Sequence, residues 1–177
     1  MTEEHLRFPI GKFIKTPNPS KEFLNQCITI IEEFPAKIRL ETENLNDTQL
    51  DTRYRDGGWT IRQVVHHIAD SHVNSLVRFK LTLTEDKPIV KPYFEDRWAE
   101  LADSKFMPVE PALQMIEGIH KRWVYLLRSM SESDFSKSFI HPEHGSEVIL
   151  SDVIQLYAWH SKHHLAHITT LKRSKQW

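Results

Sequence analysis

The sequence predicts an all-α fold, a four-helix bundle with long connections between its helices. Four segments of about 20 residues place apolar side chains at helical spacing. The chain has only five glycines in 177 residues, which disfavours turn-rich all-β folds, and its nine prolines fall mostly between the four segments. This length suits one sizeable core and is short for two, so we expect a single domain over residues 1–177.

The first segment follows an N-terminal arm. Residues 1–19 are predicted to be extended, because three prolines and a glycine interrupt regular structure there. Ser20 then caps a helix that runs to about Leu45. Pro35 lies inside this helix, where it removes one backbone hydrogen bond and crowds the preceding turn. We therefore expect a kink or a break near Glu33.

The second helix is predicted from about Ile61 to Thr84, with Thr60 as its N-cap. A polar connection ending in Asp56-Gly57-Gly58 precedes it, and the two glycines permit positive φ. One face of the helix is apolar. A polar, partly ionisable row borders that face and comprises Gln63, His67, Asp70, Ser71, Asn74 and Arg78. A bundle with an internal polar site requires a helix of this kind.

Residues 87–111 are predicted to be irregular, with four prolines and one short helix at about 94–102. The connection is longer than a tight helical turn requires, so it could cross the bundle or cover a pocket. The third helix, about Glu110 to Met130, has an ordinary core face to which we assign packing only. The stretch KSFIHPEHGSEVIL alternates around a turn-like segment at 141–145, which indicates a small hairpin before the last helix.

The last helix is predicted from Ser151 to Lys172, with Ser151 as its N-cap. His160, His164 and His167 fall within one narrow stripe on its buried face. A buried imidazole left without a partner costs on the order of 1–3 kcal/mol, so something must compensate. Two histidines four residues apart project the same way and suit two ligands of one metal ion.

A catalytic metal site generally uses three protein ligands and keeps a position for water, so a third ligand must come from another element. His67 is our first choice, because it borders the apolar face of the second helix. Asp70 lies one turn further on, where a carboxylate could orient an imidazole or accept a proton, although a solvated helix carboxylate is the plainer interpretation. Spacing alone leaves four further candidates open, which are His66, His72, His120 and His141.

Composition excludes several classes of protein. A formal net charge of -1 and a pI near 6.8 provide no basic surface for nucleic acid. The N-terminus lacks a hydrophobic signal core, and no stretch approaches about 18 consecutive apolar residues, so we expect a soluble cytoplasmic protein that does not bind membranes. The single cysteine, Cys27, excludes an internal disulfide framework and a cysteine-rich zinc site, and its apolar neighbours indicate a buried position.

Two motifs, YRDGGWTIRQVVHHIADSH and YAWHSKHHLAHI, resemble the DinB superfamily of helical metal proteins, specifically its YfiT branch of metal-dependent hydrolases. Members of that branch have also been assigned as bacillithiol S-transferases. The likeness extends over almost the whole chain and includes PIGKF, EEFPAKI, KPY and HPEHGSEV. It implies a four-helix bundle of unusual connectivity, a homodimer, and one divalent ion per subunit, Zn²⁺ first and Ni²⁺ second. Three histidines would hold the ion, with water completing its shell.

The resemblance also implies the ligand set. The family's ligand on the second helix lies eight residues after the tryptophan of the GGW motif, which is His67 counted from Trp59. The two ligands on the last helix correspond to His160 and His164.

Three neutral imidazoles leave the ion its full charge, so a bound water can ionise near pH 7 and support hydrolysis of a small molecule. The same position could instead lower the pKa of a low-molecular-weight thiol and support its transfer to an electrophile. A third possibility from another class is a metal-stabilised binding bundle with a closed shell and no catalysis. Arg78 and Trp159 are candidate substrate-binding residues for either reaction.

Overall fold

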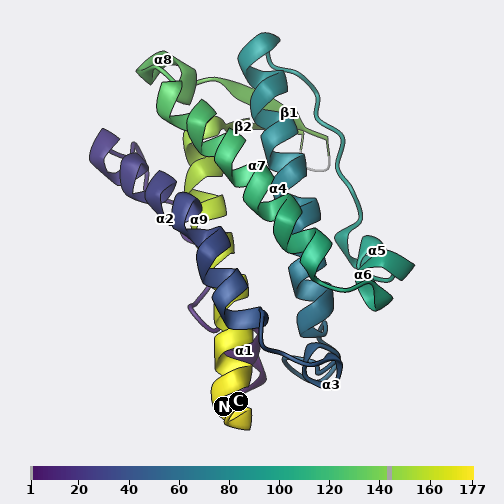
Figure 1. Ribbon diagram of the computed structural model, residues 1–177. Coiled ribbons are helices and arrows are strands. Elements are labelled where there is room, and N and C mark those ends of the chain that lie inside the picture. The colour runs from purple at the N-terminus through teal and green to yellow at the C-terminus, as the bar shows by residue number, and fades with distance from the viewer. Residues whose placement is uncertain (1, 143–144) are drawn as a thin grey trace.

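The computed structural model describes residues 2–142 and 145–177. Four long helices form a bundle (Figure 1), and they are α2 (Lys21–Thr42), α4 (Ile61–Thr84), α7 (Glu110–Ser129) and α9 (Leu150–Lys175). Helix α2 packs against α7 and α9, and α4 packs against the same two helices. Helices α2 and α4 are consecutive among the long helices but lie at opposite corners. The predicted all-α four-helix bundle is confirmed.

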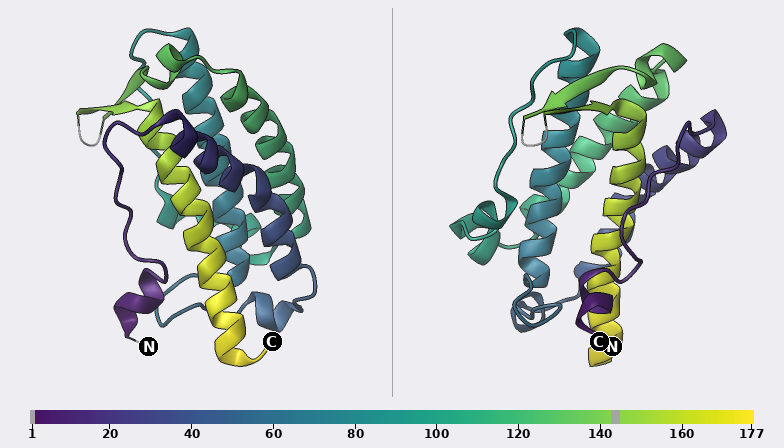
Figure 2. Two further views of the ribbon diagram at one scale, coloured as in Figure 1. Left: turned by 90° about the vertical axis from the view of Figure 1, so that its left-hand side faces the viewer. Right: turned by 180° about the vertical axis from the view of Figure 1, so that it is seen from behind.

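The directions of the helices explain the long connection after α4. The colour gradient shows that α2 and α9 run one way along the bundle while α4 and α7 run the other way (Figures 1 and 2). Because α4 and α7 are parallel, residues 85–109 must return along the length of the bundle. This connection carries two short helices, α5 (Glu95–Trp98) and α6 (Ala102–Phe106), where the sequence predicted one.

Two of the predicted N-caps are confirmed. The Ser20 hydroxyl accepts a hydrogen bond from Phe23 N at 3.2 Å, and Thr60 forms a capping box with Gln63. The predicted cap at Ser151 is wrong, because α9 begins one residue earlier and has no side-chain cap. The chain enters α9 directly from a strand, and Leu150 N donates to the carbonyl of Lys137 at 2.9 Å. The carbonyl of Lys137 therefore satisfies one of the four N–H groups that the start of a helix leaves unpaired.

Helix α2 is continuous through Pro35, so of the kink or break predicted near Glu33 the break does not occur. The ribbon of α2 instead bends along its length (Figures 1 and 2), and the helix ends at Thr42, short of Leu45. Proline has no N–H, so residue 35 cannot donate to the carbonyl four residues before it, that of Ile31. That carbonyl lies 2.6 Å from Nδ1 of a histidine on α7.

The N-terminal arm is partly helical, which corrects the prediction that residues 1–19 are extended. Helix α1 (Glu3–Arg7) forms because the Thr2 hydroxyl accepts from His5 N at 3.3 Å and acidic residues occupy the first turn. The rest of the arm lies against α9, where Thr16 N donates to Gln155 Oε1 at 2.8 Å. The arm is therefore part of the folded unit.

Two short helices and a two-stranded hairpin complete the described structure. Helices α3 (Asp47–Leu50) and α8 (Glu132–Phe135) are single turns in the connections that follow α2 and α7. The predicted hairpin is confirmed as β1 (Ser138–His141) paired antiparallel with β2 (Ser146–Ile149). Glu143 and His144, in the predicted turn, lie outside the described residues. Val90 N donates to the carbonyl of Ile140 at 3.2 Å, which ties the long connection to the hairpin.

The apolar interior consists of two clusters of buried side chains. One cluster includes Phe79 and Trp123, and the other includes Phe34 and Ile68. Histidines lie between them: the rings of His72 and His120 are 5.7 and 5.6 Å from the ring of Phe34, and both are 6.0 Å from that of Trp123. Among the residues that the structure describes, no helix has the length and apolar character needed to span a bilayer.

Candidate metal centre

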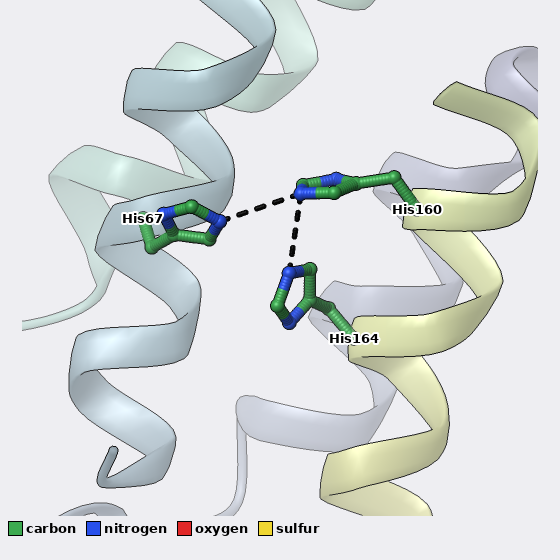
Figure 3. Close-up of side chains that lie close together, drawn as sticks. All are labelled: His67, His160 and His164. Carbon is green, nitrogen blue, oxygen red and sulfur yellow. Dashed lines mark hydrogen bonds between the residues drawn. The ribbon is translucent and has the colours of Figure 1, made fainter. Parts of the chain in front are cut away.

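Three histidines from two helices point toward one another between α4 and α9 (Figure 3). Helix α4 supplies His67, and α9 supplies His160 and His164 one turn apart. The Nε2 atom of His160 lies 3.3 Å from Nε2 of His67 and 3.2 Å from Nε2 of His164. His67 and His164 are buried, and His160 keeps some accessible surface. The same atom of each ring therefore faces a common point.

The spacing of these nitrogens fits a small divalent cation. Zinc binds imidazole nitrogen at about 2.0–2.1 Å, so two ligands at a tetrahedral angle are about 3.4 Å apart. The two Nε2–Nε2 distances, 3.3 and 3.2 Å, are close to that value. Imidazole nitrogen is a suitable donor for both zinc and nickel, so the donor set does not distinguish the two metals.

Burial keeps these imidazoles neutral. Desolvation, with a smaller contribution from His163, lowers the pKa of His67 to about 4. Desolvation likewise holds the pKa values of His160 and His164 well below the usual range. Electrostatic repulsion from the neighbouring histidines lowers both values further. At pH 7 each ring therefore has a lone pair to donate, as a metal ligand requires.

A cavity of about 530 Å³ opens onto the three histidines, all of which contribute to its lining. Its walls come from α1, α4, α9, β1, the loop before α4 and the connection after it. The cationic and aromatic lining side chains include Arg7, Tyr54, Arg55, Trp59, Arg78, Tyr93 and Trp159. A concave site with a few convergent polar groups is the usual form of a small-molecule site.

Both predicted substrate-binding residues lie in this lining. Arg78 extends from α4 and Trp159 from α9. The indole N–H of Trp159 donates to the carbonyl of Gly11 at 3.2 Å, and its ring stacks on His163 with centroids 4.3 Å apart. The N-terminal arm therefore fixes one wall of the cavity.

Asp70 is not brought to the three histidines. It is absent from the cavity lining, and within residues 2–142 and 145–177 its carboxylate makes no hydrogen bond to His67. Burial, with a contribution from Asp103, raises the pKa of Asp70 to about 6. The carboxylate thus lies near Asp103 of α6, and in the part of the chain that the structure describes no hydrogen bond links it to His67.

The four other candidates for the third ligand have different positions. His66 places Nε2 3.3 Å from the carbonyl of Met107, on the side of α4 that faces α6. His72 and His120 lie deeper in the bundle, bonded to each other at 2.7 Å. His141 lines the cavity. None of the four belongs to a cluster with metal-ligand spacing in the part of the chain that the structure describes.

A second cluster with metal-ligand spacing consists of His163, His164 and His167. The Nε2 atom of His167 lies 3.1 Å from the carbonyl of Arg7, and its Nδ1 lies 3.4 Å from Nδ1 of His164. Burial lowers the pKa of His163 to about 4 and, with repulsion from His163, that of His167 to about 3. The sequence interpretation gave neither residue a role, although both share the stretch HSKHHLAH with the predicted ligands.

A helical bundle that directs three neutral imidazoles into a cavity defines a metal-binding class of protein. Residues 30–168 match the DinB superfamily. The chain belongs to the DinB superfamily.

Its relatives are similar over their whole length. The chain is 47% identical over 177 residues to "Putative metal-dependent hydrolase YfiT" of Bacillus subtilis (strain 168), covering 100% of this chain and 99% of the relative. A Bacillus mycoides (strain KBAB4) protein of the same description is 50% identical over 172 residues, covering 97% and 98%. The solved structure of YfiT from Bacillus subtilis, described as "a probable metal-dependent hydrolase with an unusual four-helix bundle topology", superposes with a TM-score of 0.95, covering 98% of this chain and 99% of that one.

Proposed function

We propose that this protein is a metal-dependent hydrolase of small molecules in which His67, His160 and His164 hold one divalent ion per subunit, with Zn²⁺ as the first candidate. The convergence of three Nε2 atoms at the floor of the 530 Å³ cavity carries the proposal. The naming of its relatives as metal-dependent hydrolases supports it. The open side of the three rings faces the cavity, which suits a catalytic site better than a closed structural one.

The bound ion would supply an open position that lowers the pKa of water to about 7, for hydrolysis, or that of a thiol, for group transfer. The protein supplies the remaining functions. The three imidazoles fix the position of the reacting centre, and Trp159 offers a flat apolar wall beside it. Arg78 offers a cation that would pair with an anionic group of the substrate.

His163, a residue of the cavity lining, is a better candidate for the proton acceptor than Asp70. His163 lines the cavity, and its buried Nδ1 has no hydrogen-bond partner in the described part of the chain. With its pKa lowered to about 4, the ring is neutral at pH 7 and one of its two nitrogens has a lone pair; its place in the cavity lining, and not its basicity, favours it. Asp70 has a pKa nearer neutrality but lies outside the lining.

Thiol transfer is the second candidate function. Three arginines line the cavity, namely Arg7, Arg55 and Arg78, against two carboxylates, Glu95 and Asp96, and the excess of positive charge would stabilise a thiolate relative to its thiol. The cavity volume of about 530 Å³ falls within the range of small-molecule sites.

Metal content and a two-part activity screen test the proposal. The purified protein is first assayed for bound metal, then for turnover of esters and amides and, separately, for conjugation of a thiol to an epoxide or activated halide. We expect His160→Ala to lose both the metal and the activity. The matched control is His66→Ala, which alters a buried histidine of α4 that faces Met107 and not the cavity. Thiol conjugation without ester or amide turnover would show that the protein is a thiol transferase and not a hydrolase. A parent protein that binds no divalent ion would refute both candidate functions.

We also propose that residues 1–177 fold as one domain and that two copies form a homodimer, as the family resemblance implies. Sedimentation equilibrium measures the second point directly, because a monomer of 20.9 kDa and its dimer differ twofold in mass.

A further inference from the structure

A chain of buried imidazoles leads away from the candidate metal centre into the bundle. The Nδ1 atom of His160 lies 3.1 Å from Nε2 of His72, and Nδ1 of His72 lies 2.7 Å from Nε2 of His120. The Nδ1 atom of His120 lies 2.6 Å from the carbonyl oxygen of Ile31. His72 and His120 are 0% and 1% exposed, so water does not substitute for these contacts.

The carbonyl at the end sets the direction of every hydrogen bond in this chain. A carbonyl oxygen only accepts, so His120 must donate from Nδ1, and its neutral ring then has a lone pair on Nε2. His72 must therefore donate from Nδ1 to His120 and accept on Nε2. His160 must in turn donate from Nδ1 to His72. The lone pair of His160 is then on Nε2, the atom that faces His67 and His164.

The anchor of this chain depends on a feature of α2. In an unbroken helix the carbonyl of Ile31 would accept from the N–H of residue 35, and that residue is Pro35. The proline leaves the carbonyl without its helical donor, and His120 from α7 occupies the available direction. A residue that would ordinarily weaken a helix thus provides a strong, fixed acceptor inside the bundle.

His164, the other proposed ligand on α9, has a shorter series of hydrogen-bonded partners of the same kind. His167 must donate from Nε2 to the carbonyl of Arg7, 3.1 Å away, so its lone pair is on Nδ1. That nitrogen faces Nδ1 of His164 at 3.4 Å, which favours a proton on Nδ1 of His164 and a lone pair on its Nε2. The same reasoning makes His167 part of the support for the ion that His164 would hold.

We propose that His72 and His120 on one side, and His167 on the other, are positioning residues that fix His160 and His164 in the tautomer that binds metal through Nε2. This inference rests on the proposed metal centre. Partners that hold the second nitrogen of a ligand histidine orient the ring and raise its basicity, and their loss typically weakens metal binding about 10- to 100-fold.

Nitrogen-15 NMR of the histidine side chains tests the tautomers in the unaltered, metal-free protein. Long-range ¹H–¹⁵N spectra distinguish a protonated Nδ1 from a protonated Nε2 in each ring. We expect protonated Nδ1 in His72, His120 and His160, and protonated Nε2 in His167. A protonated Nε2 in His72 or His120 would overturn the inference, whether or not the protein binds metal.

Zinc titration against a chelating indicator then tests the consequence. We expect His72→Leu and His120→Leu to bind zinc about 10- to 100-fold more weakly than the parent. His72→Gln should recover most of that loss, because an amide can donate to His120 and accept from His160. The matched control, His66→Leu, removes a buried histidine of the same helix that takes no part in the chain and should leave zinc affinity within about twofold of the parent.

Two results separate the inference from the proposed function. If the parent binds zinc and a folded His120→Leu variant binds it within about twofold, the positioning role is wrong while the metal centre stands. If the parent binds no zinc, the metal centre is wrong, and with it the positioning role. Should both leucine variants fail to fold, the tautomers measured in the parent decide the question.

Discussion

Acid should unfold the metal-free protein well above the pH at which its carboxylates titrate. His120 shows why, since it is buried one ring away from the proposed ligands. Burial lowers its pKa from 6.5 to about 4, against the opposing effect of its hydrogen bond to Ile31. The unfolded chain therefore binds a proton at this position between about pH 6.5 and pH 4 that the folded chain does not bind. Stability falls as the pH falls through this window, because protons favour the state that binds more of them.

The size of the effect follows from the pKa difference. At about 1.36 kcal/mol per pH unit, lowering the pKa of His120 from 6.5 to about 4 corresponds to about 3 kcal/mol of lost stability below pH 4, of which about 2 kcal/mol is lost by pH 5. The pKa of His67 is lowered by the same amount and adds a comparable loss. A domain is typically stable by about 5–15 kcal/mol, so these two residues alone remove a large fraction. Asp70 acts in the opposite direction, because its raised pKa makes folding more favourable as the pH falls through 6.

Urea unfolding with a chelator present, at half-unit steps from pH 7.5 to pH 4.5, measures this dependence. His120→Gln is the control, because glutamine can still donate to Ile31 but does not titrate. We expect its free energy of unfolding to fall by about 2 kcal/mol less than that of the parent between pH 7 and pH 5. Parallel curves for the two proteins, or a parent curve that stays flat to pH 5, would refute the assignment of a neutral buried His120.

Three further predictions concern other parts of the molecule. Thr60→Ala removes one half of the capping box of α4 and should lower the free energy of unfolding by about 1 kcal/mol in the same urea assay. Trp123→Ala empties a site that is 0% exposed and should cost about 3–5 kcal/mol, seen as a lower urea midpoint, and a loss below 1 kcal/mol would contradict the packing described for α7. Arg78→Ala should raise KM for an anionic substrate about tenfold or more while bound metal is unchanged, and equal KM values for charged and neutral substrates would exclude its proposed role.

Periodicity in the sequence predicted the bundle because each long helix presents a continuous apolar face to the core. The caps at Ser20 and Thr60 follow from local chemistry and were predicted correctly. Ser151 was not a cap, because the chain enters α9 directly from β2 and the helix already begins at Leu150. Likewise Pro35 did not break α2, since contacts from other helices hold the chain on both sides of it. Tertiary contacts decided both cases, and a local pattern does not contain them.

The candidate site was predictable in part for the same reason. His160 and His164 share a helix, so spacing alone paired them, whereas spacing left five histidines open for the third position. The fold brings His67 to the pair, and the sequence contains no distance between α4 and α9. His120 occupies a core position on the apolar face of α7, between Ile116 and Trp123. A polar ring at such a position indicates a buried partner. The sequence interpretation kept His120 open as a metal ligand but assigned α7 packing alone, so it did not predict the contacts of His120 with His72 and Ile31.

The separation of the two apolar clusters by histidines affects how the molecule opens. Neither cluster extends along the whole bundle, so the two halves have independent hydrophobic interiors that meet at polar rings. In the metal-free state, backbone amides of α4 and α9 should show two levels of hydrogen-exchange protection, one for each half. A cation shared by α4 and α9 would link the halves and merge the two levels into a single cooperative unit.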